Sequence, residues 1–163
     1  MKLQRQRGEQ LPVNLAMLKR HLRITSDAFD DDLQHKLWAA IQRAENWMNR
    51  ILIPSEFTQT EQLKPVILLS VFDVDEIVSV EVDGTALQPE QYTWDGDRLL
   101  KLNSVTGSTI ITKFKAGGVE VEEDIKAGIL MDAGSLFTNP LDRVESLPKA
   151  SQRIYDQYKY ARR

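Results

Sequence analysis

The chain has 163 residues, with 21 Lys and Arg against 24 Asp and Glu, and its formal net charge is −3. This length predicts a single domain over residues 1–163, and the 42% hydrophobic and 28% charged residues are typical of a globular protein. The absence of cysteine excludes disulfides, thiolate catalysis and cysteine-ligated metal centres. No apolar run reaches the roughly 18 residues that a membrane-spanning helix needs.

Two helices are expected near the start of the chain, after a polar segment, residues 1–12, that we expect to be a flexible extension. Asn14 is a candidate N-cap for the first helix, which ends near Ile24. The second helix begins at Asp30-Asp31-Asp32, where negative charge complements the helix dipole, and Pro54 stops it. Its apolar stripe keeps helical spacing and consists of Leu33, Leu37, Ala40, Ile41, Ala44, Met48 and Ile51.

The middle of the chain, residues 55–118, has the pattern of a β-rich insertion. Apolar and β-branched runs at 66–72, 77–82, 92–102 and 109–114 predict strands. Turn signals separate them, of which Asp83-Gly84 is the clearest because glycine adopts positive φ at little cost.

The last third returns to helical spacing over 125–137, and Asn139-Pro140 ends that helix. A final helix follows Pro148. At about 13 residues it is too short to be stable alone, so residues 146–163 must dock either on their own domain or on a neighbouring subunit. We expect this docking helix to take part in assembly. The sequence thus predicts an α+β fold that is mainly α. It consists of two N-terminal helices, a small antiparallel β region in the middle and two C-terminal helices.

No catalytic residues, cofactor-binding residues or metal ligands are predicted. The only histidines, His21 and His35, have no serine or carboxylate placed to act with them, and no Gly-rich phosphate loop is present. The carboxylates of Asp30-Asp31-Asp32 suit the start of a helix better than a cation site. Asp73-Val74-Asp75 lacks the later Gly and Glu of a calcium loop. We therefore expect a protein that is not an enzyme and has no cofactor.

Charge is distributed unevenly along the chain. Residues 1–25 carry six bases (Lys or Arg) and one acid, and residues 149–163 carry five bases and one acid. Residues 66–101, in contrast, carry two bases and eight acids. Basic ends could neutralise phosphates, so a small nucleic-acid-binding regulatory protein is the alternative function. A hydrolase using the abundant carboxylates is weaker, because no pair of them is distinguishable from surface charge.

The final helix and the second helix carry the candidate interface residues. Tyr and Arg are the residue types that anchor protein interfaces. Trp38 lies beyond the apolar stripe of its helix, where it either packs against other helices or lies in a subunit interface. The candidates are Trp38, Arg153, Ile154, Tyr155, Tyr158 and Lys159.

Several short motifs follow one another in a characteristic order along the chain. Residues 18–24 are Leu-Lys-Arg-His-Leu-Arg-Ile, and the Asp-Asp break and Ala44-Glu45 follow them. The strand at 77–84 and the Leu87-Gln88-Pro89-Glu90-Gln91-Tyr92 hairpin come next, and then the run Asp124-Ile125-Lys126-Ala127-Gly128-Ile129-Leu130. In this order the motifs resemble the first helix, the second helix, the β region and the third helix of the small head–tail connector (adaptor) proteins of tailed bacteriophages. The resemblance covers roughly residues 11–161.

This resemblance implies a structural virion protein of a phage or prophage, without catalytic residues. Such proteins form a ring of about 12 subunits between the portal protein at the capsid vertex and the tail, and so extend the DNA channel. The implied partners are the portal protein, a tail stopper or tail-completion protein, and passing DNA bound without sequence specificity, with no membrane. The implied location is the head–tail junction of the virion, after assembly in the bacterial cytoplasm. If the acidic middle lines the channel, the candidate channel-facing residues are Asp73, Asp75, Glu76, Asp95 and Asp97.

Overall fold

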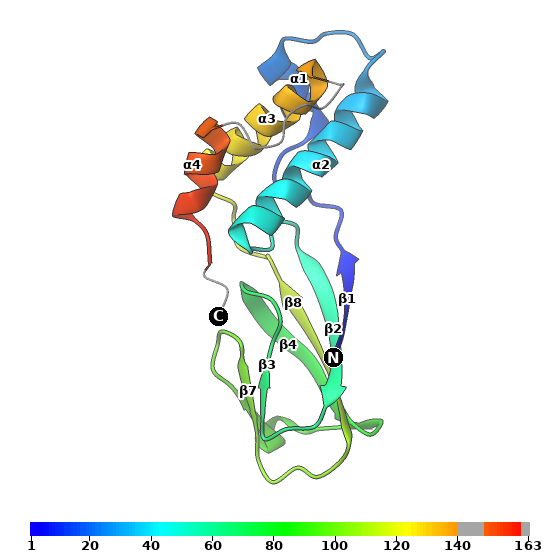
Figure 1. Cartoon of the computed structure of the whole chain (residues 1–163). Helices are drawn as coiled ribbons and strands as arrows, with labels where there is room; N and C mark the ends of the chain where they lie inside the picture. The colour runs from blue at the N-terminus through cyan, green and yellow to red at the C-terminus, as the bar shows by residue number, and fades with distance from the viewer. Residues whose placement is uncertain (140–148, 161–163) are drawn as a thin grey trace. The chain divides into compact units, whose positions relative to one another are not determined.

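The structure is a computed structural model that describes residues 1–139 and 149–160. Its contacts divide the chain into two compact units. We call residues Met1–Gln10 and Ile53–Val119 the β unit, and residues Leu11–Leu52 and Glu120–Arg163 the helical unit. The described residues form four α-helices and eight strands (Figure 1).

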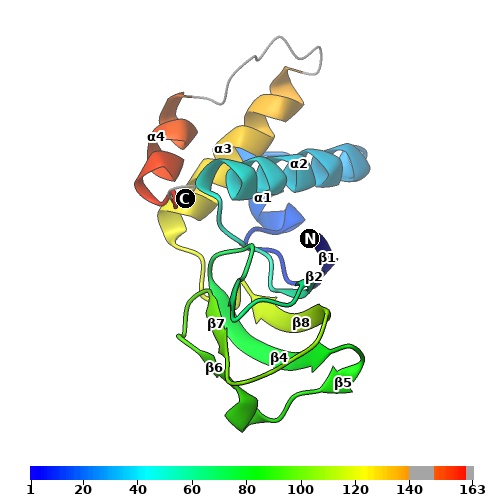
Figure 2. The same cartoon turned by 60° about the horizontal axis from the view of Figure 1, so that its bottom comes forward.

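The larger sheet of the β unit, sheet A, has the strand order β1-β2-β8-β4-β5. Every neighbouring pair in it is antiparallel. Figures 1 and 2 show β2, β8 and β4 side by side, with β1 at one edge and β5 against one end of β4. The strands are β1 (Lys2–Arg7), β2 (Ser55–Gln62), β8 (Thr109–Ala116), β4 (Val74–Val82) and β5 (Thr85–Ala86).

The smaller sheet, sheet B, has the order β3-β7-β6 and is also antiparallel. It consists of β3 (Val66–Leu68), β7 (Leu99–Leu102) and β6 (Tyr92–Trp94), preceded by the 3-10 turn η1 (Pro89–Gln91). Alternation along β3 and β7 buries Ile67 and Leu100, which lie opposite each other in the register.

The core of the β unit is built on the alternation of β2 and β8. Every second residue is buried along β8 and from Ser55 to Gln59 in β2, and the Phe57 and Phe114 rings stack with centroids 5.4 Å apart. Gln59 on the same face of β2 is buried too, and its side chain holds the backbone of Leu68 and Ser70. A buried polar group of this kind is stable because it is hydrogen-bonded.

The expectation of a mainly α fold with a small β region is wrong. The β region has eight strands in two sheets. Residues 2–7, expected to belong to a flexible extension, form β1 and pair with β2 over six residues. The physical reason is that β1 and β2 are largely polar: β1 gains its stability from pairing, and the buried face of β2 includes Ser55 and Gln59. Apolar periodicity therefore does not reveal either strand.

The helical unit contains α1 (Leu15–Leu22), α2 (Asp30–Met48), α3 (Glu123–Thr138) and α4 (Lys149–Gln157). Figure 1 shows α3 beside α2 and α4, and residues of these helices are in contact. The predicted stripe of α2 is confirmed, since all its members from Leu33 to Met48 are buried. Ile51 lies beyond the end of the helix.

Local signals set the helix ends. The predicted N-cap is confirmed, because the Asn14 side chain accepts a 2.9 Å hydrogen bond from the Met17 amide. The N-cap of α2 is Phe29, which makes no side-chain capping bond, and the three aspartates occupy the first turn. The helix ends at Asn49 in the left-handed conformation, φ 57°, ahead of the predicted stop. None of the described helices is long and apolar enough to cross a membrane.

Candidate functional site

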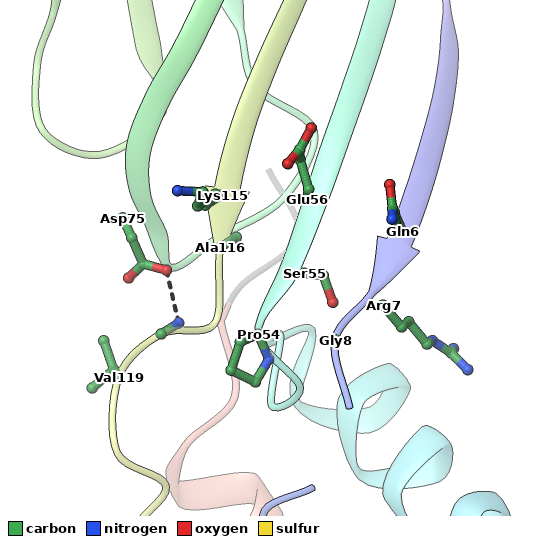
Figure 3. Close-up of a pocket in the computed structure, with 11 residues that line it drawn as sticks. Gln6, Arg7, Gly8, Pro54, Ser55, Glu56, Asp75, Lys115, Ala116 and Val119 are labelled. Carbon is green, nitrogen blue, oxygen red and sulfur yellow. Dashed lines mark hydrogen bonds between the residues drawn. The ribbon is translucent and has the colours of Figure 1, made fainter. Parts of the chain in front are cut away.

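A pocket of about 550 Å³ opens at one end of sheet A, where β1 ends, β2 begins and β8 ends (Figure 3). Four charged side chains line it, Arg7, Glu56, Asp75 and Lys115, together with apolar side chains that include Pro54 and Val119. The Ser55 hydroxyl at its rim donates to the Ile53 carbonyl at 2.6 Å. A hydroxyl that is already bonded to backbone, with no histidine in the lining, does not form a catalytic pair.

Two glycines allow the close chain approaches at this pocket. A Cβ at Gly8 would lie 2.6 Å from the Pro54 carbonyl oxygen, to which the Gly8 amide donates at 2.8 Å. A Cβ at Gly118 would lie 2.9 Å from Asp75, whose carboxylate accepts a 2.7 Å hydrogen bond from the Gly118 amide, the dashed line in Figure 3. These two hydrogen bonds join chain segments that line the pocket.

Within residues 1–139 and 149–160, no group of three or more His, Asp or Glu side chains is arranged to hold a metal ion. Two of the three aspartates at the start of α2 form ion pairs: Asp30 with Lys19 at 2.7 Å, and Asp32 with Lys36 at 3.7 Å. The His35 ring Nδ1 forms a 2.7 Å hydrogen bond with the backbone carbonyl of Asp31.

The five candidate channel-facing acids all lie in the β unit, but they do not share one role, because their hydrogen-bond and ion-pair partners differ. Asp75 holds the Gly118 amide, and Glu76 pairs with Lys115 at 3.4 Å. The Asp73 carbonyl accepts from the Gly117 amide, and Asp73 takes the left-handed conformation at φ 58°. Except for the half-buried Asp73, these acids are exposed.

Asp95 organises the turn between β6 and β7. Its Oδ1 accepts hydrogen bonds from the Asp97 amide at 2.9 Å and the Leu99 amide at 3.0 Å. These backbone donors stabilise the ionised form and lower the pKa of Asp95 below its usual value. Asp95 therefore has a structural role in sheet B, and Asp97 beside it is exposed.

The candidate interface residues are divided between core and surface. Tyr155 is fully buried in the helical unit, whereas Arg153 and Lys159 are exposed. Trp38, Ile154 and Tyr158 are half-buried. The exposed Lys159 ammonium lies 5.1 Å from the centroid of the Trp47 ring, at the C-terminal end of α2.

Sequence reasoning missed a buried polar cluster that joins α3 to α4. Asp132, on α3, is fully buried and accepts from the Ser151 hydroxyl at 2.6 Å and the Tyr155 hydroxyl at 3.2 Å. Burial raises the pKa of Asp132, with the two hydrogen bonds opposing that effect. Gly128, one turn before Asp132, makes room for the Tyr155 ring, because a Cβ there would lie 2.8 Å from it. The only sequence signal was an acid within an apolar helix face.

The predicted docking helix α4 thus packs on its own helical unit. Besides this cluster, the Trp47 indole donates to Asp156 at 2.9 Å, and the Tyr160 amide donates to the Met48 carbonyl at 2.9 Å. The ends of the expected docking segment 146–163, at residues 146–148 and 161–163, lie outside the described residues.

No protein-family model matches the chain, and no curated protein matches it. Solved structures do. One match is a chain in the neck of an empty gene transfer agent (GTA) particle, solved with C6 symmetry. It is 17% identical with a TM-score of 0.79, and the match covers 99% of this chain and 97% of that chain.

Two further structures agree with this match. A chain in the virion of a native GTA particle is 18% identical with a TM-score of 0.79. A chain in the neck of a native GTA particle, solved with C12 symmetry, is 16% identical with a TM-score of 0.77. Both matches cover 99% of this chain and 97% of the other. Over almost its whole length, the chain has the fold of a component of phage-like particle necks, consistent with the head–tail connector family that its sequence resembles.

Proposed function

We propose that this protein is a subunit of a ring connector between the portal and the tail of a tailed phage or prophage. One observation carries the proposal: a fold match over 99% of the chain to components of GTA particle necks. The sequence motifs that resemble those of head–tail connectors support the same function.

The symmetry of the related particles supports a ring. The neck structures were solved with C6 and C12 symmetry, and cyclic symmetry is what repeated head-to-tail contacts between identical subunits produce when they close. In this proposal about 12 subunits form the ring, as the C12 symmetry of one neck suggests.

The proposed role is structural and not enzymatic. The ring lies at the head–tail junction of the virion, contacts the portal protein on one side and a tail stopper or tail-completion protein on the other, and is assembled in the bacterial cytoplasm. DNA passes through it without sequence-specific binding. Exposed acids of the β unit, such as Glu76 and Asp97, would repel DNA phosphates if they line the channel.

Light scattering over a range of concentrations, with and without the portal protein, tests this function. The expected result is a monomer in dilute solution that shifts to one large species of defined mass at high concentration or on the portal. A closed dimer under every condition would contradict the proposal, since a two-fold interface uses up the contacts that a ring needs.

A further inference from the structure

In the part of the chain that the structure describes, sheet A has two open edges. β1 pairs with β2 on one side only, and β4 pairs with β8 along its length but with β5 only at Glu81 and Val82. Among the described strands, none pairs with the outer side of β1 or with the outer side of residues 74–79 of β4. Such edges present backbone N–H and C=O groups that can pair with another chain.

The directions of the edge strands suit pairing between copies. Because β1-β2, β2-β8 and β8-β4 are each antiparallel, β1 and β4 run in opposite directions. Rotation about a ring axis along the strands keeps strand direction, so β1 of a second copy placed beside β4 of the first is antiparallel to it. The sheet would then continue through both copies as an antiparallel sheet, with the two register shifts that β4 already has at Val74/Glu76 and Ile77/Ser79.

The two edges also have opposite charge. β1 carries Lys2, Arg5 and Arg7 and no acid, whereas β4 carries Asp75, Glu76 and Glu81 and no base. Glu76 and Asp75 are exposed and lie on the part of β4 that β5 leaves open. Opposite charges across an interface favour the correct pair and disfavour pairing of β1 with β1 or β4 with β4.

The register within the chain gives a specific alignment. One row across the sheet runs through Gln6, Glu56, Lys115 and Glu76, which lie opposite one another in successive strands. If the sheet continues without a shift, Gln6 of the second copy lies opposite Glu76. Directly opposite residues in an antiparallel pair are about 4.5–5.5 Å apart between Cα atoms, within the range that a disulfide can bridge.

We infer that the subunits of this protein join by edge pairing, β1 of one copy adding as a strand to β4 of the next. The inference rests on the proposed function, because it names the contact that builds the ring. The pairing is head to tail, so each copy keeps one free edge until the ring closes. The basic side chains of β1 and the acidic side chains of β4 then favour β1–β4 pairing over pairing of two like edges.

Disulfide trapping in the full chain tests this directly, since the protein has no cysteine of its own. Gln6→Cys and Glu76→Cys are made as single variants and oxidised alone and as a mixture. A second mixture, Gln4→Cys with Glu76→Cys, covers a two-residue shift, which keeps side chains on the same face. The control mixture pairs Gln6→Cys with Asp97→Cys, an exposed position in the turn of sheet B. Far-UV circular dichroism and thermal melting verify that each variant is folded.

The expected result is a covalent dimer in a β1–β4 mixture and none in the control mixture or with either variant alone. High salt should lower the yield, because it screens the charges. Dimers from Gln6→Cys alone would show two-fold β1–β1 pairing and overturn the inference, as would an absence of cross-links above the control. Electron microscopy of the same samples separates the claims: rings without β1–β4 cross-links overturn only the inferred contact. Cross-links without rings, at any concentration or with portal, support the contact and contradict the ring function.

Discussion

Tyr155 on α4 donates a 3.2 Å hydrogen bond to the Asp132 carboxylate on α3, and both side chains are fully buried. This contact fixes the short α4 to the helical unit, which a helix of nine residues needs because isolated short helices are unstable. The helix expected to act in assembly therefore also stabilises its own subunit.

Replacing Tyr155 should weaken the helical unit in two steps. Tyr155→Phe removes the hydroxyl and leaves a buried carboxylate with one partner fewer, at a cost of about 1–3 kcal/mol in the free energy of unfolding. Tyr155→Ala also leaves a cavity and should cost about 3–5 kcal/mol. Chemical denaturation measures both, and Tyr158→Phe, at a half-buried position on the same segment, is the matched control. Equal stability of Tyr155→Phe and the wild type would show that the hydrogen bond contributes nothing.

The buried Asp132 carboxyl should give stability a measurable pH dependence. Its pKa is raised in the folded state, so the fold binds the proton more tightly than the unfolded chain does. The contribution of Asp132 to the free energy of unfolding is fully present below the pKa of the unfolded state, about 3.9. It is lost as pH rises through the higher pKa of the folded state. Other carboxylates titrate as well, so the quantity to measure is the melting temperature of the wild type minus that of Asp132→Asn. This difference should fall as pH rises above the unfolded pKa; a constant difference would contradict the assignment.

Adding a methyl group at Gly128 should separate helix propensity from packing. In an isolated helix, Gly→Ala gains up to about 1 kcal/mol. Here the new Cβ would lie 2.8 Å from the Tyr155 ring, and overpacking of this kind costs about 1–3 kcal/mol. Gly128→Ala should therefore be destabilising. At Gly134 on the same helix the new Cβ meets the end of the flexible Leu22 side chain at 3.1 Å, so Gly134→Ala should be neutral or stabilising in the same denaturation experiment.

Asp95 and Asp97 should differ although both are exposed acids of one turn. Asp95→Asn weakens acceptance from the Asp97 and Leu99 amides and should lower the melting temperature, while Asp97→Asn should not. Since backbone donors lower the pKa of Asp95, its contribution is present above the unfolded pKa and is lost as pH falls through the folded value. The difference in melting temperature between the wild type and Asp95→Asn should therefore become smaller at acidic pH. Equal melting temperatures of the two variants would show that the hydrogen bonds of Asp95 do not stabilise the turn.

The helical half of the molecule could be predicted because its core residues are apolar and regularly spaced. The stripe of α2 from Leu33 to Met48 and the Asn14 cap both appear where the sequence places them. The β half could be predicted only where the strands are apolar. Polar β1 gains its stability from pairing with residues some 50 positions away, and no local pattern encodes that distance.

The candidate interface and channel-facing residues could be predicted only by residue type, because their surroundings depend on tertiary contacts. Tyr155 was predicted at an interface because aromatic residues are common there, yet the glycine at 128 and the acid at 132 form a buried site for it. Several acids of the β unit, which looked alike in sequence, differ in the structure because each meets a different backbone amide or lysine. Asp75 meets Gly118, and Glu76 meets Lys115. Such partners depend on tertiary contacts, which composition does not show.

The central claim is that this protein forms a ring connector, and electron microscopy of the purified full chain mixed with its portal protein tests it most directly. We predict ring-shaped particles with cyclic symmetry, of the order that the C12 neck structure suggests, seated on the portal. Portal particles that remain bare, with this protein present beside them only as monomers or closed dimers at every concentration, would contradict the account.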